Sequence, residues 1–239
     1  MPVPRNAAAS CYYAGMPTSL IKHCASVRQG AYLPHWTLEE SIYSVTFRLV
    51  DAVPQPVLNA WKAERSAMLV EALARTGGLL AEQHRRIDDL FSEKIERYLD
   101  VGCGSCWLVQ PAIAEMVGGA LRYFDRARYD LFAWSVMPNH VHAILRPRGD
   151  QKLSGIIHSW KSYTAKLANS VLQRTGHFWQ AEYYDHLIRD ENELKAQIRY
   201  VLQNPEKAGL RDWRWAGSMV DLGWMPKKDG AAVGNSMGR

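Results

Sequence analysis

Residues 131–145 constrain the fold of this chain more than any other part of the sequence. Two runs rich in β-branched, aromatic and aliphatic residues are separated here by Met-Pro-Asn at 137–139. Such runs on either side of a short turn predict a β-hairpin. Because successive strand side chains point to opposite faces, Val141, Ala143 and Leu145 form one apolar face. The hairpin therefore predicts an antiparallel sheet that buries one side against a core.

Helical and strand patterns alternate around this hairpin. Residues 42–50 and the short run 107–109 predict strands, while apolar residues recur at helical spacing between Ile113 and Phe124. The remaining helices are expected at 56–75, 79–99 (split from the first by Gly77 and Gly78), 153–173 and 191–204. This order predicts an α+β fold with helices packed on one face of a small antiparallel sheet, plus an inserted helical hairpin.

The length of 239 residues suits one domain with an insertion. We expect a flexible arm over 1–27, a folded domain over 28–218 with its helical insertion at about 55–99, and a flexible tail over 219–239. No run approaches the roughly eighteen apolar residues of a membrane span, and the first residues lack the order of a signal peptide. Four scattered cysteines are too few for a disulfide framework. The expected location is the cytoplasm.

The charge of the chain favours a polyanionic partner. The net charge is +5 and the pI about 9.0. Neutralisation of phosphates by Lys and Arg is the main sequence-independent attraction between proteins and nucleic acids. The composition is therefore consistent with nucleic-acid binding, although many basic proteins bind none.

His140 and His142 form the first constellation with chemical potential. Residues two apart in a strand share a face, so the two imidazoles lie side by side, opposite the apolar face. Two imidazoles on a rigid strand make half of a site for a divalent metal. The alternative is a pair of partly exposed strand histidines without a ligand.

Tyr200 and Asn204 form the second constellation. Asp190 and Glu193 are spaced as a capping box that opens a helix. Tyr200 and Asn204 are one turn apart on this helix, away from its apolar stripe. Pro205 predicts that the helix ends at Asn204. The alternative is a surface tyrosine followed by an ordinary helix-end asparagine.

Several segments resemble a known family, in the same order along the chain. The stretch 133–142 (Ala-Trp-Ser-Val-Met-Pro-Asn-His-Val-His) closely resembles the His-hydrophobe-His segment of the IS200/IS605-like Y1 transposases, a group of HUH endonucleases. Within that superfamily the chain looks most like the REP-associated tyrosine transposases. Further matching segments lie at 30–36, 45–48, 160–166, 178–185 and 200–210, so the resemblance covers about 28–218.

The resemblance implies a ferredoxin-like or RRM-like sheet and a role for each candidate residue. His140 and His142 would bind a divalent metal, Mg²⁺ or Mn²⁺, although two imidazoles would also suit zinc. Tyr200 would be the nucleophile that forms a covalent 5′-phosphotyrosine. Asn204 takes the place of a third ligand, where many members have the longer Gln. The implied partner is single-stranded or hairpin (REP-like) DNA in the nucleoid, with no small-molecule substrate. Monomer and dimer both remain open.

Basic and aromatic residues nearby are candidate DNA contacts. Lys161, Lys166, Arg189 and Arg199 could contact phosphates, and Trp160 could stack on an unpaired base. The alternatives are a solvated basic face and, for most tryptophans, burial in the core. Tyr163 is a rival nucleophile without a ligand one turn away, and Cys103 to Cys106 is interpreted as a structural turn.

Two other functions stay open at this point. The first is a non-catalytic module that binds single-stranded or hairpin DNA with the same fold. The second is a hydrolytic metal-dependent nuclease, which would release a free 5′-phosphate and form no protein–DNA adduct.

Overall fold

A five-stranded antiparallel sheet forms the centre of the protein. The computed structural model describes residues 26–29, 34–37, 41–76 and 81–220. The strand order is β6-β3-β5-β4-β7, and every neighbouring pair is antiparallel. These strands are β3 (Tyr43–Arg48), β4 (Tyr129–Val136), β5 (His140–Pro147), β6 (Tyr184–Leu187) and β7 (Ala216–Ser218), and β1 (Ser26–Gln29) pairs separately with β2 (Pro34–Thr37). The predicted α+β class and the 131–145 hairpin are confirmed.

In the part of the chain that the structure describes, five α-helices and one 3₁₀ turn surround this sheet. They are α1 (Gln55–Thr76), α2 (Ala81–Asp100), η2 (Trp107–Val109), α3 (Pro111–Tyr123), α4 (Leu153–Val171) and α5 (Glu191–Lys207). None of the helices within the described ranges has a long enough apolar stretch to cross a bilayer.

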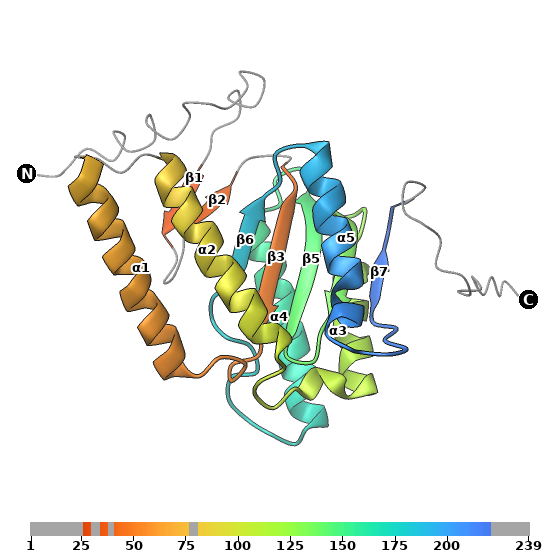
Figure 1. Ribbon diagram of the computed structural model, residues 1–239. Coiled ribbons are helices and arrows are strands. Elements are labelled where there is room, and N and C mark those ends of the chain that lie inside the picture. The colour runs from red at the N-terminus through yellow and green to blue at the C-terminus, as the bar shows by residue number, and fades with distance from the viewer. Residues whose placement is uncertain (1–25, 30–33, 38–40, 77–80, 221–239) are drawn as a thin grey trace, which may run out of the picture.

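The helices pack on both faces of the sheet, which corrects the expectation of a single covered face (Figure 1). Val141, Ala143 and Leu145 of β5 belong to the larger core, which α3 and α4 complete. Ile144 points the other way and packs with Ile198 and Val201 of α5. An amphipathic helix such as α5 needs only a few apolar strand residues to dock, and the alternating pattern of β5 provides them on both sides.

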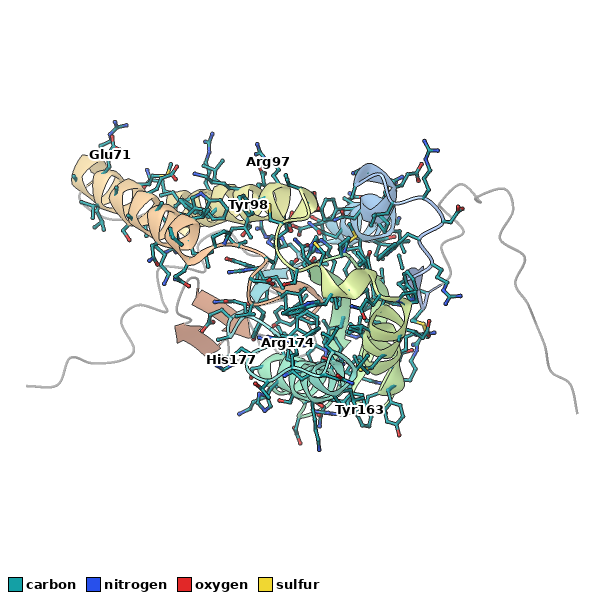
Figure 2. All side chains as sticks on the ribbon, turned by 90° about the horizontal axis from the view of Figure 1, so that it is seen from below. Glu71, Arg97, Tyr98, Tyr163, Arg174 and His177 are labelled. Carbon is teal, nitrogen blue, oxygen red and sulfur yellow. The ribbon has the colours of Figure 1, made fainter. Side chains whose placement is uncertain are left out.

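The inserted helices α1 and α2 lie on the same side of the sheet as α5 (Figures 1 and 2). Ile95 and Leu99 of α2 are buried in the main core. Trp61 of α1 packs edge-on against Tyr98, with ring centroids 5.4 Å apart. The hairpin insertion predicted from 55–99 therefore has its own internal packing and is also anchored to the sheet. Gly77 and Gly78, which separated its helices in the sequence, lie outside the described residues.

Two local predictions were wrong. Residues 107–109 form the 3₁₀ turn η2 instead of a strand, because Cys106 adopts a left-handed conformation (φ 47°) and local bonds such as Val109 N to Cys106 O close the turn. Helix α5 continues past Asn204 to Lys207. Pro205 removes one donor in the last turn, yet Ala208 N still bonds to Asn204 O, and the chain leaves the helix at Gly209 (φ 73°).

The first glycine of the Gly118–Gly119 pair in α3 has a packing role. A Cβ added to Gly118 would lie 3.0 Å from the ring of Trp134 on β4. The absence of a side chain lets the helix approach the sheet closely, which offsets the weak helix propensity of glycine.

The expected domain boundaries at 28 and 218 stay predictions, and the arm and tail lie largely outside the described residues.

Candidate active site

The two strand histidines form a buried, closely spaced pair. His140 and His142 are each 1% exposed, so the alternative of partly exposed histidines is wrong. Their rings are nearly perpendicular, with centroids 4.7 Å apart, and their Nε2 atoms are 2.9 Å apart. Strand β5 fixes this spacing because both side chains point toward α5, as the alternation predicted.

The outer nitrogen of each histidine has its own hydrogen-bond partner. Nδ1 of His140 lies 2.7 Å from Asn139 Oδ1, and Nδ2 of Asn139 donates to the Cys103 carbonyl at 2.9 Å. The amide oxygen therefore faces His140, so Nδ1 carries the proton and Nε2 has the free lone pair. Nδ1 of His142 lies 2.8 Å from Thr46 Oγ1 on β3. Such outer partners orient a histidine that binds metal through its other nitrogen.

Burial keeps both imidazoles neutral. It lowers the pKa of His142 to about 4. Burial also lowers the pKa of His140 well below its usual range, helped by the charges of His142 and Arg48. A neutral imidazole is the form that binds a metal ion, so the surroundings favour that function at neutral pH.

Helix α5 brings Tyr200 and Asn204 to the histidine pair. Asn204 is 1% exposed, and its Nδ2 lies 3.0 Å from His142 Nε2. The ring of Tyr200 lies edge-on to the ring of His142, with centroids 5.5 Å apart. The four residues singled out from the two sequence constellations therefore converge from β5 and α5. Tyr200 is half-buried and contacts His142, so it differs from a fully exposed surface tyrosine.

Two carboxylates of α2 complete this cluster, and sequence reasoning missed both. Glu96 Oε2 accepts a hydrogen bond from the Tyr200 hydroxyl at 3.2 Å. Asp100 Oδ1 lies 3.9 Å from His140 Nε2. No sequence signal distinguishes them, because α2 carries many acidic residues on its polar side.

These carboxylates change the acidity of the groups around them. Burial raises the pKa of Glu96 to about 7, and the hydrogen bond from Tyr200 partly opposes this. Burial, followed by the negative charges of Glu96 and Asp100, raises the pKa of Tyr200 above its usual range. The tyrosine is therefore protonated at neutral pH, and its proton must leave before the oxygen can act as a nucleophile.

The donor set fits a divalent cation only if an amide takes part. Within the described ranges, no three His, Cys, Asp or Glu side chains are arranged to hold an ion. His142 Nε2 does lie between two such groups, 2.9 Å from His140 Nε2 and 3.0 Å from the Asn204 amide nitrogen. Asn204 presents its nitrogen to His142, so it would need to turn its amide to offer an oxygen ligand.

A buried cation lies beside the pair. Arg48, opposite His140 in the β3–β5 register, is 1% exposed, and its Nη2 has no hydrogen-bond partner in the described part of the chain. Its guanidinium lies 5.3 Å from the centre of the Tyr184 ring. A fixed positive charge at this position makes the site attractive to anions.

An open cleft leads to His140. Its volume is about 220 Å³, and its walls come from the end of α2, the β4–β5 turn and the segment after α5, with Asp100, Pro138, Ala208 and Leu210 among the lining residues. A phosphate of a bound strand could approach the buried histidines from this side.

Two of the residues expected to contact DNA, Trp160 and Lys161, have their polar groups bonded within the protein. Trp160 is 3% exposed and its indole nitrogen donates to the Tyr129 hydroxyl at 2.9 Å, so it is a core residue and cannot stack on a base. Lys161 donates to the carbonyls of Gln180 and Ala181, each at 2.6 Å, and burial lowers its pKa to about 8. Its ammonium ties α4 to the following loop and is already engaged.

The other candidate DNA contacts are exposed, but they lie on different sides of the sheet. Arg189 precedes α5, and Arg199 lies on α5 next to Tyr200. Lys166 lies on α4, across the sheet from the histidines. Tyr163, the rival nucleophile, is 57% exposed and points outward from α4, on the opposite side of the molecule from α2 and α5 (Figure 2).

The Cys103–Cys106 segment forms a turn, as interpreted from the sequence. Both cysteines are free thiols. Gly104 has φ 89° and lies so close to Asp51 that a Cβ would be 2.7 Å from the Asp51 carbonyl oxygen. The turn positions the Cys103 carbonyl that holds Asn139 and, through it, His140.

Comparisons with known proteins identify a family that is similar to this part of the chain. The family described as "Transposase IS200 like" matches residues 112–204, a segment that contains His140, His142, Tyr200 and Asn204. The REP-associated tyrosine transposase of Escherichia coli K12 is 27% identical over 115 residues, covering 39% of this chain and 67% of the relative. A Haemophilus influenzae protein that carries the same name provisionally is 26% identical over 108 residues, covering 39% of this chain and 61% of the relative.

The chain thus spans about three fifths to two thirds of the curated relatives that it matches. A solved structure described as a REP-associated tyrosine transposase bound to a REP hairpin aligns with 80% of this chain and 81% of that chain, at 17% identity and a TM-score of 0.42. The resemblance found in the sequence is therefore confirmed by the family match, which makes residues 112–204 of this chain similar to the IS200-like transposases.

Proposed function

We propose that this protein is a metal-dependent single-strand DNA endonuclease and transposase that uses Tyr200 as its nucleophile. The observation that carries the proposal is the convergence of Tyr200, Asn204 and the buried histidine pair inside the segment that matches the family. The names of the curated relatives support strand transfer as the reaction class. Hairpin DNA is the expected substrate from the resemblance.

His140, His142 and Asn204 would hold the cation. When bound there, a divalent ion such as Mg²⁺ or Mn²⁺ supplies positive charge that polarises the scissile phosphate. The neutral state of both imidazoles suits this function, since their lone pairs are free at neutral pH. Arg48 adds a second, permanent positive charge near His140.

Tyr200 then performs the covalent step. Its hydroxyl oxygen attacks phosphorus, the bond between phosphorus and the 3′ oxygen breaks, and a 5′-phosphotyrosine remains. The phosphodiester energy is retained in this linkage. The 3′-hydroxyl of a second strand can therefore attack the phosphotyrosine, release Tyr200 and join the two strands.

The covalent adduct provides the test. Labelled single-stranded DNA from the flanks of the gene is incubated with protein and Mg²⁺, and adducts are separated on a denaturing gel. We expect Tyr200→Phe to abolish the adduct and to change DNA binding by less than about threefold, because only the attacking oxygen is lost. Tyr163→Phe is the matched control and should retain the adduct, since Tyr163 lies across the sheet.

Three outcomes would reject the proposal. An adduct that persists in Tyr200→Phe would assign the nucleophile elsewhere. A free 5′-phosphate product without any adduct would indicate a hydrolytic nuclease. Binding without cleavage by the wild type in Mg²⁺ or Mn²⁺ would indicate a binding module.

A further inference from the structure

We propose that Glu96, from the helical hairpin outside the family-matched segment, is the group that accepts the proton of Tyr200 during attack on DNA. This inference rests on the proposed function, because it assigns a base to the proposed nucleophile. It gives the α1–α2 insertion a chemical role beside Tyr200, Asn204 and the histidine pair, which all lie within 112–204.

The contact between the two side chains has the geometry of a proton transfer. The Tyr200 hydroxyl donates to Glu96 Oε2 at 3.2 Å, which is at the outer limit of the range for a general base and its proton. The carboxylate touches the atom that would attack phosphorus. Asp100, one turn later on α2, points toward His140 instead.

Glu96 differs from Glu93 and Glu64 of the hairpin in its partner. Glu93 pairs with Arg97, and Glu64 pairs with Lys94. No ion pair involves Glu96 in the ranges that the structure describes. Without a cation to stabilise its negative form, the carboxylate remains able to take up a proton.

The surroundings of Glu96 give its carboxyl group a pKa that suits a general base at neutral pH. Burial raises its pKa to about 7, and the nearby charges of Asp100 and Glu93 act in the same direction. From α5, the Tyr200 hydroxyl faces Glu96, and Lys207 lies over the Tyr200 ring with its Nζ 5.4 Å from the centroid. A general base works best when its pKa lies near the working pH.

The helix holds this carboxylate in place. Ile95 and Leu99, on either side of Glu96 in the sequence, are 5% and 1% exposed in the main core. Rotation or displacement of α2 would expose both side chains to water. The carboxylate is therefore presented to Tyr200 by a rigid element, as a catalytic group requires.

The proton and bonds balance in both directions. The Tyr200 proton moves to Glu96 Oε2 as the bond from tyrosine oxygen to phosphorus forms and the bond from phosphorus to the 3′ oxygen breaks. The leaving 3′ oxygen takes a proton from solvent. In the rejoining step the 3′-hydroxyl of the second strand loses its proton to solvent, and Glu96 returns its proton to Tyr200.

The test compares Glu96→Gln with Glu93→Gln in the full chain. Both substitutions remove one carboxylate from α2, but Glu93 pairs with Arg97 and does not contact Tyr200. We expect the single-turnover rate of adduct formation to fall on the order of 100-fold or more in Glu96→Gln and by less than about threefold in Glu93→Gln. DNA binding and the thermal midpoint should stay close to wild type in both.

The pH profile provides a readout that a purely structural role would not change. The wild-type rate should rise with pH and level off above about 7, the pKa of Glu96. This inflection should be absent in Glu96→Gln. Added formate should also accelerate Glu96→Ala in proportion to its concentration, because a small carboxylate can occupy the vacated space and accept the proton.

The outcomes separate this inference from the proposed function. A Tyr200-dependent adduct that forms at the wild-type rate and with the wild-type pH profile in Glu96→Gln would overturn the role of Glu96 alone. A faster reaction in Glu96→Gln would also overturn it, since Glu96 would then restrain Tyr200. Absence of a Tyr200-dependent adduct in the wild type would reject both the proposed function and the base.

Discussion

At the scale of single residues, the hydrogen bonds behind the histidines determine what the site can bind. Asn139 fixes the tautomer of His140, and Thr46 contacts the outer nitrogen of His142. Burial then removes the positive charge from both rings. The result is a pair of neutral rings whose Nε2 atoms face each other 2.9 Å apart. A cation between them would satisfy both.

Thr46→Val tests the contribution of one outer partner. The two side chains have the same shape, but valine cannot hydrogen-bond to His142 Nδ1, so the imidazole loses its fixed orientation. We expect Mn²⁺ affinity, measured by calorimetric titration, to fall about 10- to 100-fold. Ser44→Ala is the control, because Ser44 lies on the same face of β3 but contacts Gln197 instead. Equal Mn²⁺ affinity in Thr46→Val and wild type would contradict the role of Thr46.

At the scale of elements, the start of α5 determines where Tyr200 stands. The N-cap half of the capping box predicted at 190–193 is confirmed: Asp190 Oδ1 accepts from Glu193 N at 2.9 Å. Glu193 reaches back to Arg189 N at 2.7 Å and also pairs with His186 of β6. These bonds tie the helix start to the sheet edge, while Ile198 and Val201 bury its apolar stripe. Tyr200 is left facing α2 and the histidines.

Asp190→Ala should therefore destabilise the protein. Loss of a helix N-cap costs about 1 kcal/mol of unfolding free energy, measured by urea denaturation. Asp190→Asn should lose only a few tenths of a kcal/mol, because an asparagine oxygen caps nearly as well. An unchanged urea midpoint in Asp190→Ala would show that the cap contributes nothing to the stability of α5.

At the scale of the whole molecule, the sheet separates two surfaces with different roles. One surface carries α2, α5 and the candidate site, and the other carries α4 with the exposed Tyr163 and Lys166 (Figure 2). The net charge of +5 attracts DNA without choosing between these surfaces. The proposed function favours the α5 surface, since it requires a scissile phosphate to reach Tyr200.

Salt titrations of two variants test which surface binds DNA. We expect Arg199→Gln to weaken binding of a single strand and to reduce the log–log salt slope by about 0.7, the value for one phosphate contact. Lys166→Gln should leave both quantities close to wild type. Fluorescence anisotropy with the same strand, alone and as a perfect duplex, provides the measurement. A larger effect of Lys166→Gln would move the DNA to the α4 surface, and equal cleavage of single strand and duplex would indicate a duplex-acting nuclease.

Much of this arrangement was predictable because its signals are local. Alternation in β5 placed His140 and His142 on one face, and the helical period of α5 placed Tyr200 and Asn204 on another. These regularities depend only on residues a few positions apart. The edge strands β6 (four residues) and β7 (three residues) were not predicted, since so few residues carry no measurable period. The burial of Trp160 was left open for a different reason: the sequence pattern of a helix does not by itself show whether a tryptophan packs in the core or stays on the surface.

Tertiary structure alone decided which distant residues complete the site. Glu96 and Tyr200 are 104 positions apart, and Thr46 and His142 are 96 apart. The sequence determined the elements and the faces that carry the histidines and the tyrosine, through short-range periodicity. It could not determine that one acid of α2 meets Tyr200, because every acid on the polar side of a helix satisfies the same pattern. That choice depends on how deeply Ile95 and Leu99 seat the helix against the sheet, which is a property of packing.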